Sequence, residues 1–226
     1  MTALSGFCSM ATQHLLADLV AAYRANEVKL ASISGIEAAA RVRAGEACDF
    51  VVLAADAIAK LEAEGHVVAG TAAPIANAGI AVAVRKASAA PDLSTEAAFR
   101  AAIDRAKRIG YSTGPSGVHL LKLFERWGIA KSIQPRLMQA PPGVAVATLV
   151  ANGDVDIGLQ QLSEMIHSPA ITVAGLLPPG AQLVTTFSGA VCTKSAQKDA
   201  ARALLGFFAS KDHDAERRRH GLMPTK

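Results

Sequence analysis

Small hydroxyl and glycine residues fill a loop at residues 110–119, between an expected apolar strand (108–111) and an expected amphipathic helix (118–127). Such a loop places backbone N–H groups and hydroxyls at the positive end of a helix dipole, where an anion can bind without a cationic side chain. The candidate binding residues of this loop are Ser112, Ser116, Gly117 and Val118. The alternative is that Ser116 only caps the helix.

Three further strand ends carry the same kind of residues, at 9–12, 32–35 and 158–163, and none of the four segments contains Arg or Lys. A ligand held there would be an anion or a polyol, bound by neutral N–H and O–H groups. Taken singly, each serine could instead be a cap or turn residue. The candidate ligand residues of these segments are Ser9, Met10, Ser34, Gly35 and Gln161. Val144 follows a Pro-Pro-Gly turn and could add a backbone N–H at the start of an expected helix (144–151).

Groups for acid–base or metal chemistry are sparse. The six histidines show no paired ligand spacing, and no serine has a plausible His/Asp relay, so we expect no metal, no cofactor and no hydrolase. The weak catalytic candidates are Glu37, His119 and Glu164, each of which a solvated or supporting position explains as well. The three cysteines form no CxxC pair and imply neither a zinc site nor a disulfide framework.

The composition is that of a folded protein, with 51% apolar and 19% charged residues in 226. The net charge of +4 is concentrated in Arg217–Arg219, which we expect at a solvated helix end. No basic stripe with interleaved aromatics is present, so a nucleic-acid partner is not expected. No charged-then-apolar leader precedes the first expected strand (2–7), so the protein is either periplasmic with its leader removed or cytoplasmic.

Strands and helices alternate along the chain, which predicts an α/β fold with mixed, mainly parallel sheets. Two long glycine-punctuated strand segments, at 77–85 and 186–193, flank a self-contained set of elements. This pattern predicts one lobe inserted into another, with residues 1–80 and 187–226 in lobe I and 81–186 in lobe II. Two crossing hinge strands would join the lobes, and a ligand would bind in the cleft between them.

Several of these segments together resemble a known family. Residues 32–36, 40–45, 48–55, 116–119 and 155–160 are similar to the periplasmic molybdate-binding proteins of ABC transporters, and the similarity extends over essentially the whole chain. The resemblance implies a two-lobe type II periplasmic-binding fold that closes over an oxyanion by hinge motion. Gln161 stands where those proteins generally carry a tyrosine, and residues 116–118 and 158–164 look closer to a divergent branch that includes bacterial aconitate isomerase.

The leading hypothesis is therefore a monomeric solute-binding protein for a small oxyanion or carboxylate, with an ABC-transporter permease as the candidate protein partner. One alternative is an isomerase similar to aconitate isomerase, which needs a base near the substrate carbon. A cytoplasmic anion sensor is the other.

Overall fold

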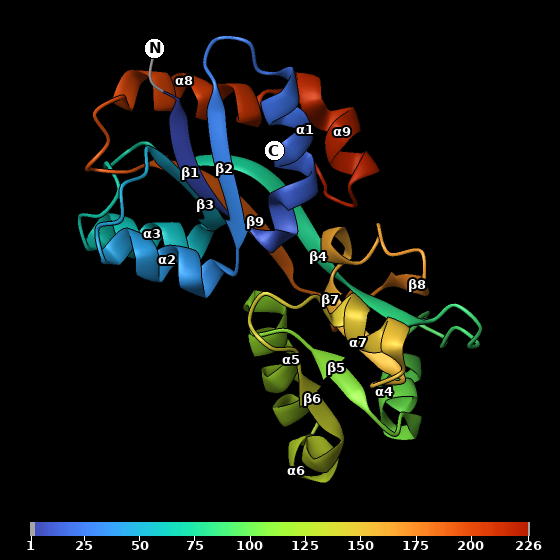
Figure 1. Ribbon diagram of the computed structural model, residues 1–226. Coiled ribbons are helices and arrows are strands. Elements are labelled where there is room, and N and C mark those ends of the chain that lie inside the picture. Colours follow the sequence, from blue (N-terminus) through green and yellow to red (C-terminus); the bar gives the residue numbers. More distant parts are fainter. Residues whose placement is uncertain (1–2, 226) are drawn as a thin grey trace. The chain divides into compact units, whose positions relative to one another are not determined.

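The computed structural model describes residues 3–225 (Figure 1). By their internal contacts these residues form two compact units. Unit 1 comprises residues up to Ala78 together with Thr185 onward, and unit 2 comprises Gly79–Val184. The chain enters unit 2 within β4 (Ala73–Arg85) and leaves it at the start of β9 (Val184–Val191).

Unit 1 is a sheet with the strand order β2-β1-β3-β9-β4. Its other strands are β1 (Leu4–Ser9), β2 (Val28–Ile33) and β3 (Phe50–Ala54). β1 pairs in parallel with β2 and β3, whereas β3 pairs antiparallel with β9. The strand expected at residues 2–7 thus begins at Leu4 and runs on to Ser9, and position 2 lies outside the described residues.

Helices cover both faces of this sheet (Figure 1). Successive side chains of a strand point to opposite sides, and in β3 both sets are apolar and buried. Phe50 and Val52 pack with α1 (Gln13–Ala22) and α8 (Lys198–Ala209) in one core. Val51 packs with α2 and α3 in another. The remaining helical segments of unit 1 are η1 (Met10–Thr12), α2 (Gly35–Arg43), α3 (Ala55–Ala63), η4 (Lys211–His213) and α9 (Asp214–Arg219).

Unit 2 is a mixed sheet in which β4 pairs antiparallel with β7 (Ile157–Gln161) and β8 (Ile171–Leu176). β5 (Ile109–Tyr111) lies in parallel between β7 and β6 (Leu137–Gln139). Its helical segments are α4 (Glu96–Arg105), α5 (Pro115–Arg126), α6 (Ala130–Ile133), η2 (Gln134–Arg136), α7 (Val146–Asn152) and η3 (Leu162–Glu164). The predicted mixed α/β class is confirmed, while β6 and α6 were not predicted.

The expectation of a solvated end at Arg217–Arg219 is wrong for Arg217, which is 1% exposed. Its guanidinium donates to the carbonyl oxygens of Ile75 (2.6 Å), Phe208 (2.7 Å) and Ser210 (2.8 Å), and it pairs with Asp214 at 2.9 Å. Arg217 therefore fastens α9 to β4 and to the end of α8, and its charge is not available to solvent.

None of the helices among residues 3–225 is both long enough and apolar enough to cross a membrane.

Candidate functional site in unit 2

Three buried polar side chains form a hydrogen-bonded chain at the carboxyl ends of β5 and β7. The hydroxyls of Ser112 and Ser116 are 2.9 Å apart, and Ser116 Oγ donates to Oε1 of Gln161 at 3.0 Å. Their exposed fractions are 8%, 0% and 2%. The three residues come from the β5–α5 loop, the first turn of α5 and the last position of β7. The structure thus brings together residues that are as many as 49 positions apart in the sequence.

The β5–α5 junction explains why these serines meet. α5 begins at Pro115 with Gly114 as its N-cap, three residues before the expected start at 118. Ser116 consequently lies inside the first turn, so the interpretation that it only caps the helix is wrong. A Cβ on Gly117 would overlap the carbonyl oxygen of Ser112, and glycine is therefore the residue that lets the loop fold back against the helix.

The Ser112–Ser116–Gln161 hydrogen bonds use some of the donors of these three side chains and leave others unpaired. A serine hydroxyl has one proton, and that of Ser116 goes to Gln161 Oε1, so the 2.9 Å bond must be donated by Ser112. Ser112 Oγ in turn accepts from the N–H of Gly114 at 3.3 Å. The side-chain NH2 of Gln161 is left: its Nε2 is buried without a hydrogen-bond partner. The buried hydroxyl of Ser163, two residues further on, is in the same condition.

An unpaired buried donor costs about 1–3 kcal/mol, so each of these two groups calls for a further acceptor, either an ordered water molecule or a ligand oxygen. The first turn of α5 adds two more donors, because the N–H groups of Ser116 and Gly117 have no acceptor within the helix. Together with Gln161 Nε2, which is held beside them by the Ser116 hydrogen bond, they make a neutral, donor-rich cluster at the positive end of a 12-residue helix.

Two other expected donors are already engaged. The N–H of Val118 donates to the carbonyl of Gly114 at 3.2 Å, and 53% of the residue is exposed. Val144 does not start a helix, because α7 begins at Val146, and its N–H closes a turn onto Pro141 at 3.0 Å. The expectation for Val144 is thus corrected.

Gln160 faces the opposite side of the sheet from Gln161 and anchors the start of α7. Its Oε1 accepts from the N–H of Val146 at 2.7 Å, and its Nε2 donates to Glu164 at 2.8 Å. Burial raises the pKa of Glu164 to about 8, against the opposing effect of the Gln160 hydrogen bond. A carboxyl group that exchanges its proton near neutral pH therefore lies three residues after Gln161.

The other two weak candidates make ordinary structural contacts. The ring Nε2 of His119 lies 2.8 Å from the carbonyl oxygen of Ala181. Glu37 is exposed and pairs with Arg41 at 2.6 Å, one turn along α2. Among residues 3–225 there is no group of three or more His, Cys, Asp or Glu side chains placed to hold a metal ion.

In unit 1 the structure places the two predicted serine loops next to each other. Ser9 ends β1 opposite Ile33 of the parallel strand β2, so Ser9-Met10 and Ser34-Gly35 leave the same edge of the sheet. Ser9 Oγ accepts from the N–H of Ala11 at 3.4 Å, and Ser34 Oγ accepts from the N–H of Glu37 at 3.2 Å. Both serines are helix caps here, and both are half-buried.

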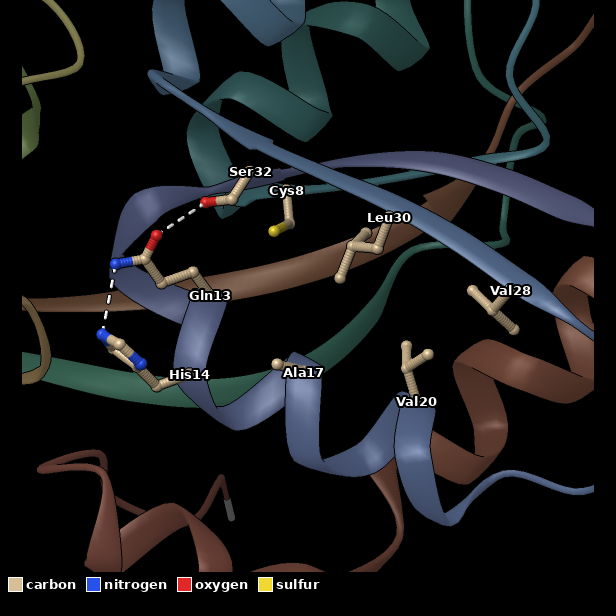
Figure 2. Close-up of a pocket in the computed structure, with 8 residues that line it drawn as sticks. All are labelled: Cys8, Gln13, His14, Ala17, Val20, Val28, Leu30 and Ser32. Atoms are coloured by element: carbon tan, nitrogen blue, oxygen red, sulfur yellow. Dashed lines mark hydrogen bonds between the residues drawn. The ribbon is translucent and has the colours of Figure 1, made fainter.

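A pocket between α1 and β2 in unit 1 was not predicted (Figure 2). Its volume is about 480 Å³, and it is lined by Cys8, Gln13, His14, Ala17, Val20, Val28, Leu30 and Ser32. Figure 2 shows Ser32, Gln13 and His14 joined by hydrogen bonds of 3.1 and 3.2 Å, with aliphatic side chains further along the helix and strand. Burial, followed by the charge of His220, lowers the pKa of His14. The alternation of Val28, Leu30 and Ser32 along β2 was the sequence signal for this face.

Comparisons with known proteins identify the family and support the fold. A model of the bacterial extracellular solute-binding proteins matches residues 4–223. Aconitate isomerase of a Pseudomonas species is 38% identical over 188 residues, which are 82% of this chain and 71% of that protein. The periplasmic molybdate-binding protein of Azotobacter vinelandii superposes with a TM-score of 0.81 at 18% identity, covering 99% of this chain and 100% of that one. PEB3 with bound L-phospholactate superposes with a TM-score of 0.75 at 12% identity, covering 98% and 100%.

Proposed function

The chain belongs to the family of bacterial extracellular solute-binding proteins, and from this premise we propose that it binds a small carboxylate or oxyanion through neutral hydrogen-bond donors. The observation that carries the proposal is the unpaired, buried NH2 group of Gln161. It supplies two N–H donors beside the start of α5 and has no acceptor of its own.

An anion is the ligand class that best fits these donors. An oxygen next to Gln161 Nε2 would also meet the positive end of α5 and the N–H groups of its first turn. Ser112 can contribute as well, because its hydroxyl can turn from Ser116 to the ligand while Ser116 keeps its bond to Gln161. A cation fits less well, because the only oxygens in this set are neutral and each of them already accepts one hydrogen bond.

Within the anions we propose a di- or tricarboxylate of the aconitate type, with molybdate as the rival. The relative at 38% identity is named for its action on aconitate, whereas the molybdate-binding neighbour shares 18% identity and supports the fold alone. PEB3 was solved with L-phospholactate, another small organic acid, on the same fold. In this proposal an ABC-transporter permease receives the bound anion.

Ligand-induced stabilisation tests the proposal directly. The melting temperature is measured with trans-aconitate, citrate, molybdate, tungstate and sulfate, because a ligand at a hundredfold excess over its Kd stabilises the folded state by about 2.7 kcal/mol. We expect a saturable rise with the carboxylates that Ser116→Ala abolishes. Ser132→Ala, an exposed hydroxyl on α6 of the same unit, is the matched control. A rise with molybdate alone would contradict the carboxylate assignment, and no rise with any of the five would contradict anion binding.

A second candidate function is isomerisation of aconitate, which the 38% identity favours. Moving a double bond requires a group that takes a proton from one carbon and returns a proton to another. Of the three weak candidates Glu164 has the pKa suited to this role, about 8, although its carboxylate here accepts from Gln160, which faces the opposite side of the sheet from Gln161.

Turnover is followed by the absorbance of trans-aconitate as the cis isomer forms, for the parent chain and for Glu164→Gln. Turnover that Glu164→Gln removes while trans-aconitate still raises the melting temperature supports the enzyme. Binding without turnover in the parent chain would support a binding protein and contradict the enzyme.

A further inference from the structure

Two of the three cysteines lie in contact although they are 144 positions apart in the sequence. The Sγ atoms of Cys48 and Cys192 are 3.2 Å apart, and the residues are 6% and 3% exposed. Cys48 lies just before β3, and Cys192 lies just after β9. β3 and β9 are antiparallel neighbours, and the ladder continues past their ends with Cys192 N donating to Asp49 O at 2.9 Å.

The pairing of β3 with β9 therefore fixes the backbone of both cysteines and holds their thiols next to each other. Cys192 also forms an isolated antiparallel bridge with Val67, so its backbone is held by two neighbouring segments. The third cysteine, Cys8, belongs to the core on the opposite face of the sheet, and burial raises the pKa of its thiol to about 11.

The pair differs in reactivity. A hydrogen bond from Cys192 lowers the pKa of Cys48, against burial and the carboxylates of Asp49 and Glu46, while the pKa of Cys192 is raised. Cys48 is thus the better thiolate, and Cys192 holds its proton. A small cavity of about 90 Å³ adjoins both sulfurs, with Glu46, His66 and Lys194 in its wall. This cavity gives the two side chains room to turn.

We propose that Cys48 and Cys192 are a redox-active pair that closes to an intramolecular disulfide by exchange with a small-molecule disulfide. The Cys48 thiolate attacks one sulfur of the oxidant, forming a mixed disulfide and releasing one thiolate of the reagent. Cys192 then passes its proton to solvent, and its sulfur attacks the Cys48 sulfur and expels the second thiolate. The two cysteines lose two electrons and two protons, and the reagent becomes two thiols.

The cross-link would enclose the whole of unit 2 within one covalent loop, because residues 79–184 lie between the two cysteines. Closing so long a loop restricts the unfolded chain strongly, and oxidation should raise the melting temperature by roughly 4–16 °C.

The test uses the full chain treated with oxidised glutathione or with reduced dithiothreitol. The expected result is a fall in titratable thiols under denaturing conditions from three to one. It is accompanied by the loss of two hydrogen atoms from the intact mass and by a cross-linked peptide containing Cys48 and Cys192. Cys8→Ser should close in the same way, whereas Cys48→Ser and Cys192→Ser should not.

Three free thiols after oxidation, glutathione adducts without ring closure, or a cross-link that includes Cys8 would each overturn the proposal. Peptide mapping of the parent chain gives this answer even where a serine variant does not fold. The melting temperature of oxidised and reduced Cys8→Ser is the second readout, and equal values would refute the predicted stabilisation by the Cys48–Cys192 disulfide.

Discussion

Replacing Gln161 by glutamate exchanges the unpaired NH2 group for an oxygen while keeping the shape of the side chain and the acceptor that Ser116 uses. We expect Gln161→Glu to fold, because Ser116 Oγ can still donate to a carboxylate oxygen. Ligand binding should suffer more. A hydrogen bond to a charged group contributes about 1.5–3 kcal/mol, so losing one weakens the Kd roughly 10- to 150-fold. Repulsion between the new carboxylate and an anionic ligand adds to that loss.

The substitution also carries its own internal check through pH. Burial of the new carboxyl at a position that is 2% exposed raises its pKa. Below that pKa the group is protonated and regains one O–H donor, so the affinity of the variant relative to the parent chain should recover as the pH falls. Calorimetric titration with trans-aconitate from pH 8 down to pH 5.5, with both proteins at each pH, measures this ratio.

Gln134→Glu is the matched charge control, because it adds the same charge at an exposed position of η2 in the same unit. It should leave the Kd within about twofold, since exposed charges interact weakly. Unchanged affinity in Gln161→Glu would refute the reasoning, and so would a loss that does not vary with pH or that Gln134→Glu reproduces.

Three further predictions concern the framework of the site and the fold. Gly117→Ala should displace the β5–α5 loop, because the added methyl group meets the carbonyl oxygen of Ser112, and urea unfolding should show a loss of about 1–3 kcal/mol together with weakened binding; a variant as stable as the parent would contradict the close approach. Folding raises the pKa of Glu164 from 4.5 to about 8, so the free energy of unfolding should decline by up to about 1.4 kcal/mol per pH unit as the pH rises from 4.5 to 8. Glu164→Gln should flatten this dependence of stability on pH. Identical slopes in the variant and the parent chain would show that Glu164 is not the cause. Arg217→Met leaves three carbonyl oxygens without their donor and should lower the free energy of unfolding by about 3 kcal/mol or more, whereas the exposed Arg202→Met should change it little; equal effects of the two would contradict the anchoring role.

The fold class followed from the sequence because alternating apolar strands and amphipathic helices leave few other packings. Loop composition also marked the strand ends at Ser9, Ser34, Ser112 and Gln161, since hydroxyl and glycine residues gather where helices begin. Local patterns carry this much because caps and strand ends depend on neighbouring residues.

Tertiary contacts decided what the sequence could not. Nothing near residue 116 indicates that its hydroxyl meets residue 161, because sheet register makes that contact. Arg217 was expected in solvent with its two neighbours. It is buried because the backbone carbonyl oxygens of Ile75 and Phe208, in other elements, accept from its guanidinium. The pairing of Cys48 with Cys192 likewise needs the antiparallel register of β3 with β9, which no spacing rule between two distant cysteines reports.

The most direct measurement of the central claim is the NMR signal of the Gln161 side-chain NH2, assigned by its absence from Gln161→Glu, during titration with trans-aconitate and with molybdate. Anion binding by this group predicts that its two proton resonances shift downfield and saturate together with the calorimetric binding curve. Resonances that stay in place while the ligand binds, or the absence of saturable binding of either anion, would contradict it.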